Sequence, residues 1–260
     1  MSQQVIELQL WQLAAAYIFV LLLLAIVRSK GIPREREIFI ATVRMTLQLI
    51  ITGYVLVYLF ENIHPLLTVL AVMLMLIFAI ANILKRVKVG LSSALKRTIA
   101  FSMVAGTLTS LLYFILVVIN LVPWYEPRYF IPIAGMIIGN SMTGISLGVT
   151  RLVEGMHTQK NLVEAALMLG ATPKMASKHI VDNAFDSAII PTINSMVGMG
   201  IVFLPGMMTG QILSGVSPLT AIEYQIAIML GIVGSVALTV IIFVELSYKT
   251  FFNTEQQLEL

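Results

Sequence analysis

Residues 17–27, YIFVLLLLAIV, form an uncharged apolar run that decides the class of this protein. The run lies within the longer stretch 8–27, and about 20 apolar residues suffice for a helix to cross a bilayer. No basic segment precedes it and no small-residue cleavage site follows it. We therefore predict a retained membrane helix and not a signal peptide.

The rest of the 260-residue chain repeats this pattern. Apolar residues make up 58% of the sequence and charged residues 11%, and the mean hydropathy is +0.95, far above that of soluble domains. Six further stretches carry almost no charge: 38–60, 65–84, 98–122, 129–150, 188–204 and 222–244. We predict an all-α polytopic membrane protein, one transmembrane domain over 1–260 with about seven spanning helices. No room remains for a large soluble catalytic domain.

The basic residues lie in alternate connections. Four are in 28–37, five in 85–97 and four in 151–187, and Lys249 lies in the tail, whereas the other connections contain only Arg128. The positive-inside rule predicts an outer N-terminus and a cytoplasmic C-terminus, in a multi-pass protein of the inner (plasma) membrane. The net charge of +3 gives no reason to expect nucleic acid. Because the chain has no cysteine, disulfides, cysteine-liganded metals and thiol catalysis are excluded.

The cytoplasmic connection 151–187 is the longest and carries a spaced motif. Glu164, Ala165 and Ala166 are followed after three residues by Gly170 and after nine more by Ile180. Residues 162–169 are good helix formers, Gly170 suits a left-handed C-cap, Thr172 an N-cap, and Pro173 a first helical turn. We expect a helical hairpin made of two short helices along the inner membrane face.

This spacing resembles the EAA loop of ABC-transporter permeases, which docks in a groove of the cytosolic ATPase. The usual continuation x-L-P is replaced here by Val181-Asp182-Asn183. The alternative interpretation is an ordinary amphipathic hairpin that contains Glu-Ala-Ala. If the resemblance holds, the coupling residues are Glu164, Ala165, Ala166, Gly170, Ala171, Thr172, Pro173 and Ile180.

A longer series of strings resembles the FetB family of ABC permeases. In order along the chain, these are IPIAGMI at 131–137, Gly139-Asn140-x-Met142, LGATP at 169–173, LPGMMxG at 204–210 and Tyr224-Gln225. The resemblance implies a seven-helix subunit that works with a separate FetA-type ATPase and exports iron. ATP and magnesium would be used by that partner, with no cofactor bound by this chain, and ABC architecture implies a homodimer embedded in membrane lipids.

Polar residues at membrane depth are costly and are therefore candidates for function. The candidate pathway comprises Arg44, Gln48, Asn140, Ser141, Asn194, Ser195, Met207 and Met208. Arg44 can instead snorkel to the cytoplasmic side, and Gly135-x3-Gly139 favours close helix packing. Pro191, Gly198 and Gly200 predict a broken sixth helix. No HxxxH or paired-carboxylate pattern lies within a span, so the metal ligands are unknown.

No G-x-x-x-x-G-K-[ST] motif occurs, so this chain does not hydrolyse ATP through a Walker-type loop. Our first hypothesis is the membrane subunit of a metal-exporting ABC transporter. The alternatives are an ABC permease for a non-metal solute and a stand-alone secondary transporter or channel, although no internal repeat of 188–210 supports the latter. A membrane-bound enzyme is disfavoured, since no catalytic cluster is visible.

Overall fold

The computed structural model describes residues 8–86 and 91–259, and within these ranges every regular element is a helix. The predicted all-α membrane fold is confirmed. Lys88, one of the basic residues counted above, and residues 1–7 lie outside the described residues. The elements are α1 (Leu10–Ala16), α2 (Ile18–Ser29), α3 (Glu35–Glu61), α4 (Pro65–Arg86), α5 (Ser93–Tyr113), the π-helix η1 (Phe114–Val118), α6 (Pro127–Thr158), α7 (Lys160–Met168), α8 (Pro173–Gly198), α9 (Gly206–Leu213), α10 (Pro218–Ser247) and the 3-10 helix η2 (Tyr248–Phe251).

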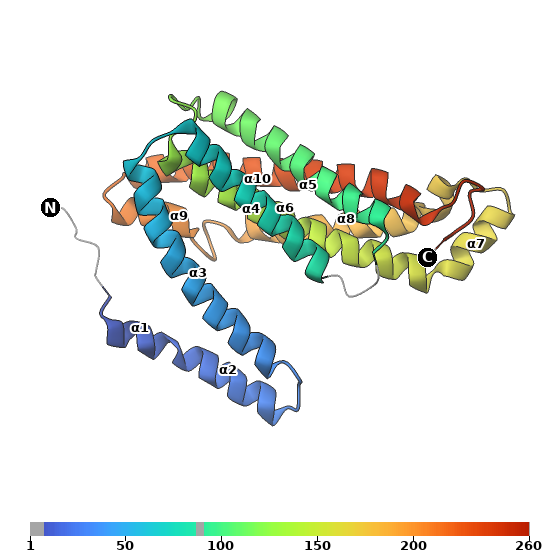
Figure 1. Ribbon diagram of the computed structural model, residues 1–260, viewed down its shortest axis with the longest axis horizontal. Coiled ribbons are helices and arrows are strands. Elements are labelled where there is room, and N and C mark those ends of the chain that lie inside the picture. The colour runs from blue at the N-terminus through green and yellow to red at the C-terminus, as the bar shows by residue number, and fades with distance from the viewer. Residues whose placement is uncertain (1–7, 87–90, 260) are drawn as a thin grey trace.

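Helices α4, α5, α6, α8 and α10 form an elongated bundle (Figure 1). The last long helix, α10, packs against α5, α6, α8 and α9. Phe243 of α10, Ile145 and Leu152 of α6 and Ile99 of α5 are fully buried in the shared core. In a membrane, lipid covers an apolar helix face as well as another helix does. The bundle is therefore stabilised by the close van der Waals packing of these side chains between the helices.

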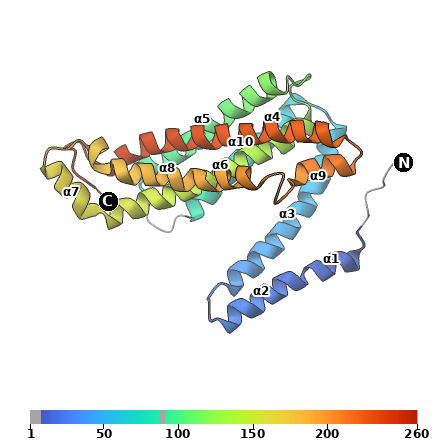
Figure 2. The same ribbon diagram turned by 180° about the vertical axis from the view of Figure 1, so that it is seen from behind.

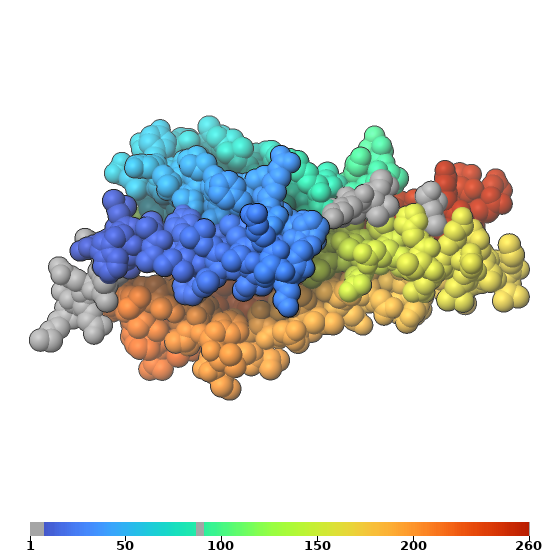
Figure 3. Space-filling view, turned by 90° about the horizontal axis from the view of Figure 1, so that it is seen from below, coloured from blue at the N-terminus to red at the C-terminus, as the bar shows by residue number. Residues whose placement is uncertain are grey.

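The first three helices form an N-terminal arm, residues 10–61, that leans away from this bundle (Figure 2). Tyr17 Oη and Thr46 Oγ1 lie 2.6 Å apart and join α2 to α3. Val27 and Leu59 are the buried residues of the arm. Seen from below, the arm covers one part of the molecule and leaves the end that carries α7 uncovered (Figure 3).

Six helices are long and apolar enough to cross a membrane, where the sequence predicted about seven. The described residues give no seventh such helix at 188–204, because α8 begins with a charged half containing Lys174, Lys178 and Asp182. Residues 188–198 of α8 extend only about 16 Å at 1.5 Å per residue. The remaining predicted spans each overlap one of the six.

The predicted break in the sixth apolar segment is confirmed, and it lies after Gly198. Pro191 remains inside α8, whereas Gly200 has a φ of +83° and Met199 pairs with Phe203 in an isolated bridge. A positive φ is readily adopted only by glycine, so Gly200 marks the turn that leads the chain into α9.

Close packing at Gly135 and Gly139 is not observed among the described residues. A Cβ on Gly139 would meet nothing within 4 Å, and one on Gly135 would meet only the Met75 methyl at 3.8 Å. The close contacts of α6 occur further along, where a Cβ on Gly144 would lie 2.9 Å from Val236 and one on Gly155 2.5 Å from Ile180. Within this chain, the close contacts of α6 therefore lie at other glycines than the predicted pair.

Candidate coupling hairpin and polar groove

The cap geometry predicted for the hairpin between α7 and α8 is confirmed. Gly170 has a φ of +90°, and its N–H donates to Leu167 O at 2.9 Å while Ala171 N–H donates to Ala166 O at 3.0 Å. Thr172 Oγ1 accepts from Met175 N–H at 3.4 Å, and Pro173 opens α8. These bonds satisfy the free carbonyls of α7 and a free N–H of α8, which fixes the turn.

The two helices of the hairpin are not both short. Only α7 is a separate short helix; α8 runs for 26 residues, and residues 151–158 are the end of α6. The prediction of a second short helix was wrong because position 183, where the usual motif places proline, holds Asn183. Proline would break the helix, whereas asparagine allows its backbone bonds to continue.

The motif residues divide between the exposed turn and the core. Ile180 is buried against Gly155 of α6, and Glu164 lies 3.7 Å from Lys160 on the surface of α7. Ala165, Gly170 and Thr172 are exposed, and Ala166, Ala171 and Pro173 are half-buried. The turn also presents large apolar side chains: Met168 is 87% exposed and Leu169 89%.

An ion pair ties the start of α8 to α10. Lys174 Nζ lies 3.1 Å and 3.4 Å from the two carboxylate oxygens of Glu245. The hydrogen bond to Glu245 and its negative charge raise the pKa of Lys174 above its ordinary value. Both side chains are largely exposed, so this pair orients the hairpin base more than it stabilises the fold.

A polar groove of about 530 Å³ lies between α6 and α8 next to the hairpin. Its polar lining comprises Arg151, Glu154, Thr158, Gln159, Asn183, Asp186 and Ser187. Arg151 and Glu154 form an ion pair at 3.5 Å within α6. Sequence patterns did not assign this groove, because its lining residues become neighbours only when α6 and α8 pack together.

Four of the predicted pathway residues lie on α6 and α8, the two helices that form the groove. Asn140 of α6 and Asn194 of α8 are exposed, and Asn140 Nδ2 donates to Met136 O at 2.8 Å. Ser195 Oγ donates to Pro191 O at 2.9 Å. Ser141 differs from these: it is fully buried and lies 3.0 Å from Ser235 Oγ, inside the interface between α6 and α10.

The remaining candidates lie on other elements. Arg44 and Gln48 are exposed on the arm, and the Arg44 guanidinium lies 5.1 Å from the Phe78 ring of α4. Met207 and Met208 belong to α9, where Met208 is buried. The chain therefore does not gather all eight candidates into one site.

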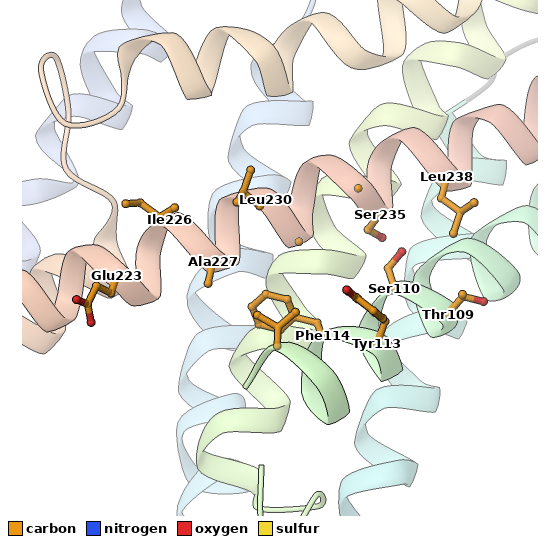
Figure 4. A pocket seen from close by; sticks show the side chains of 13 residues that line it. Thr109, Ser110, Tyr113, Phe114, Glu223, Ile226, Ala227, Leu230, Ser235 and Leu238 are labelled. Carbon is orange, nitrogen blue, oxygen red and sulfur yellow. The ribbon is translucent and has the colours of Figure 1, made fainter. Parts of the chain in front are cut away.

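A cavity of about 670 Å³ lies between α5 and α10 and is lined chiefly by apolar groups (Figure 4). The Phe114 ring packs over Gly231, and Glu223 lies toward one end. Within 8–86 and 91–259, no three His, Cys, Asp or Glu side chains are grouped to hold a metal ion.

A family model described as "Uncharacterised protein family (UPF0014)" matches residues 10–252. The chain belongs to the UPF0014 family. The "UPF0014 membrane protein YjkA" of Bacillus subtilis (strain 168) is 38% identical over 95% of this chain and 97% of that protein. The "Probable iron export permease protein FetB" of Escherichia coli (strain K12) is 34% identical over 95% of this chain and 93% of its own.

The "Protein ALUMINUM SENSITIVE 3" of Arabidopsis thaliana is 36% identical over 95% of this chain and 88% of its own. No solved structure matches the chain. The resemblance to FetB is thereby confirmed, and this UPF0014 member is a multi-pass membrane protein.

Proposed function

We propose that this chain is the membrane subunit of an ABC transporter that exports iron or another metal ion from the cytoplasm. The exposed apolar turn at Met168 and Leu169 carries the proposal. It lies on a connection that the basic residues assign to the cytoplasm, outside the six helices that are long and apolar enough to cross a membrane. A protruding apolar turn of this kind favours a groove on a partner protein, here a FetA-like ATPase that uses ATP and magnesium.

Helix α8 connects the hairpin turn directly to the bundle, and this connection supports a mechanism by which movement of the turn reaches the polar groove. Helix α8 is continuous from Pro173 to Gly198, about 39 Å at 1.5 Å per residue. Ile180 rests on Gly155, so displacement of the turn tilts α8 across α6. That tilt changes the width of the polar groove, because α6 and α8 form its two walls.

Different residues support the identity of the cargo and the presence of a second copy of the chain. Carboxylate and amide groups of the groove suit weak, exchangeable contacts with a cation, and the name of the FetB relative favours iron. Arg44 and Gln48 on the little-packed arm, together with Asn140 and Asn194, favour a path completed by a second copy in the membrane.

One experiment tests both the coupling and the cargo. Leu169→Asp places a charge on the apolar turn, and Leu219→Asp makes the same change at another exposed leucine, in the first turn of α10 on the outer side. Each variant is co-expressed with the ATPase from the same source organism, and ATPase capture and cellular iron are measured under iron excess. We expect Leu169→Asp to abolish capture and raise cellular iron, with Leu219→Asp like wild type.

Undiminished capture by Leu169→Asp would reject the coupling hairpin. Loss of capture with cellular iron unchanged, and another solute altered, would retain the ABC assignment and reject iron as the cargo.

A further inference from the structure

Gln225, near the start of α10, is a buried amide whose oxygen has no donor. The residue is 7% exposed, and Oε1 has no hydrogen-bond partner among the described residues. Its Nε2 donates to Met199 Sδ at 3.7 Å. Because a thioether sulfur only accepts, this contact fixes the orientation of the amide and leaves Oε1 as the orphan. A buried acceptor without a partner is costly to leave unsatisfied, and a bound cation is one group that would satisfy it.

The contact partner, Met199, lies at the break of α8. There Gly200 N–H donates to Phe203 O at 3.0 Å, and the chain passes through Pro205 before α9 begins at Gly206. Helix α9 packs against α10, which carries Gln225. The break lies at the end of the bundle opposite α7 (Figure 1). Irregular backbone is tolerated at membrane depth where it lines a cavity or is buried in protein.

Methionines are concentrated in the same segment. Met196, Met199, Met207 and Met208 are four of the 15 methionines of the chain, and they fall within 13 residues. An even distribution would place about one there. Thioether sulfur is a soft ligand that selects soft metal ions, whereas an amide oxygen also accepts harder ones. The methionine segment and Gln225 of α10 together offer both kinds of donor, and none of these side chains is charged.

We propose that Gln225 Oε1 and Met199 Sδ contact the metal cargo at the outer end of its path. The identity of the ligand as a metal ion rests on the proposed function. A soft or borderline cation would bind Gln225 Oε1, which can only accept. It would also bind the lone pair of Met199 Sδ that the amide N–H of Gln225 does not use. Both donors are neutral, so the contact is weak enough for the ion to leave.

The test uses the full chain in lipid nanodiscs without the ATPase, with its methionine methyl groups labelled with carbon-13. Fe²⁺ under anaerobic conditions and Ag⁺ are the probes, and Met199→Leu assigns the Met199 signal. We expect Fe²⁺ to broaden, and Ag⁺ to shift, the Met199 signal at lower concentration than the signals of the exposed Met45 and Met73.

Substitutions at position 225 provide the comparison. Gln225→Leu is expected to raise, at least fivefold, the ion concentration that gives half of the maximal change in the Met199 signal. Gln225→Glu is expected to lower that concentration. Gln211→Leu, which removes a glutamine from the neighbouring α9, is expected to leave the response unchanged. Thermal unfolding checks the fold: Gln225→Leu removes an unpaired oxygen, so its unfolding temperature should not fall.

An unmoved Met199 signal at millimolar ion, or equal responses of Gln225→Leu and Gln211→Leu, would overturn the proposal and leave Gln225 as a packing residue. Since no ATPase is present, this result is independent of ATPase capture. If the chain captures the ATPase but the Met199 signal does not move, only the metal contact is rejected. If the Met199 signal moves but the ATPase is not captured, only the ABC assignment is rejected.

Discussion

At the scale of single residues, two glycines with similar positive φ angles lie at opposite ends of the molecule. Gly170 in the hairpin and Gly215 before α10 have φ values of +90° and +94°, and a Cβ on either would meet open space. A substitution at either position therefore strains the backbone without a clash. The left-handed conformation costs about 1–2 kcal/mol for a residue with a side chain.

We expect Gly170→Val to weaken ATPase capture strongly and Gly215→Val to leave it intact, although both lower stability by similar amounts. In the proposed coupling the hairpin turn presents its apolar side chains to the ATPase in one orientation, whereas the distribution of basic residues predicts that the turn before α10 lies on the other side of the membrane. Capture from membranes, with thermal unfolding of each variant, is the measurement. Equal loss of capture in both variants would indicate a general effect of instability.

At the scale of elements, α6 and α8 cross where Gly155 meets Ile180. Gly155→Ala places a methyl group 2.5 Å from Ile180 Cγ2, and overpacking of this kind costs about 1–3 kcal/mol. Ile180→Ala removes that atom and leaves a cavity, which costs about 2–5 kcal/mol. We expect the double variant to be more stable than the sum of the two costs predicts, since the new methyl group occupies part of the cavity.

Unfolding in detergent measures this coupling, and additive costs would contradict the packing described. Gly139→Ala is the matched control on the same helix, since its methyl group meets nothing within 4 Å. Alanine in a helix is favoured over glycine by about 0.5–1 kcal/mol, so the control should be neutral or slightly stabilising.

Much of this arrangement could be predicted from the sequence, because the signals are local. A run of about 20 apolar residues indicates a span, and the cap at Gly170 depends only on its neighbours. Hydropathy reports the membrane boundary and not the end of a helix, so the extension of α6 to Thr158 was missed. The contacts of Ser141 with Ser235, and of Met199 with Gln225, join distant positions that no local pattern relates.

At the scale of the whole molecule, the absence of cysteine allows a direct test of orientation. Asn161→Cys introduces a thiol on α7, and Ser214→Cys introduces one in the turn between α9 and α10; both positions are exposed. The distribution of basic residues predicts opposite sides of the membrane. A membrane-impermeant maleimide should label Ser214→Cys in intact spheroplasts and Asn161→Cys only after permeabilisation.

The unsubstituted chain serves as the blank, since it has no thiol to react. Labelling of Asn161→Cys in sealed spheroplasts would invert the orientation and would remove the hairpin from the reach of a cytosolic ATPase.

The position of α10 has a consequence for biosynthesis. The helix that packs against α5, α6, α8 and α9 follows all of them in chain order, so it is synthesised after them. The N-terminal arm, joined by Tyr17 and Thr46, precedes the bundle in the chain, whereas the contacts that α10 makes can form only after residues 218–247 have been synthesised. A premature stop codon before residue 218 would therefore leave α4, α5, α6 and α8 in contact with one another but without the α10 face that completes their core, and we expect this product to be less stable than the full chain.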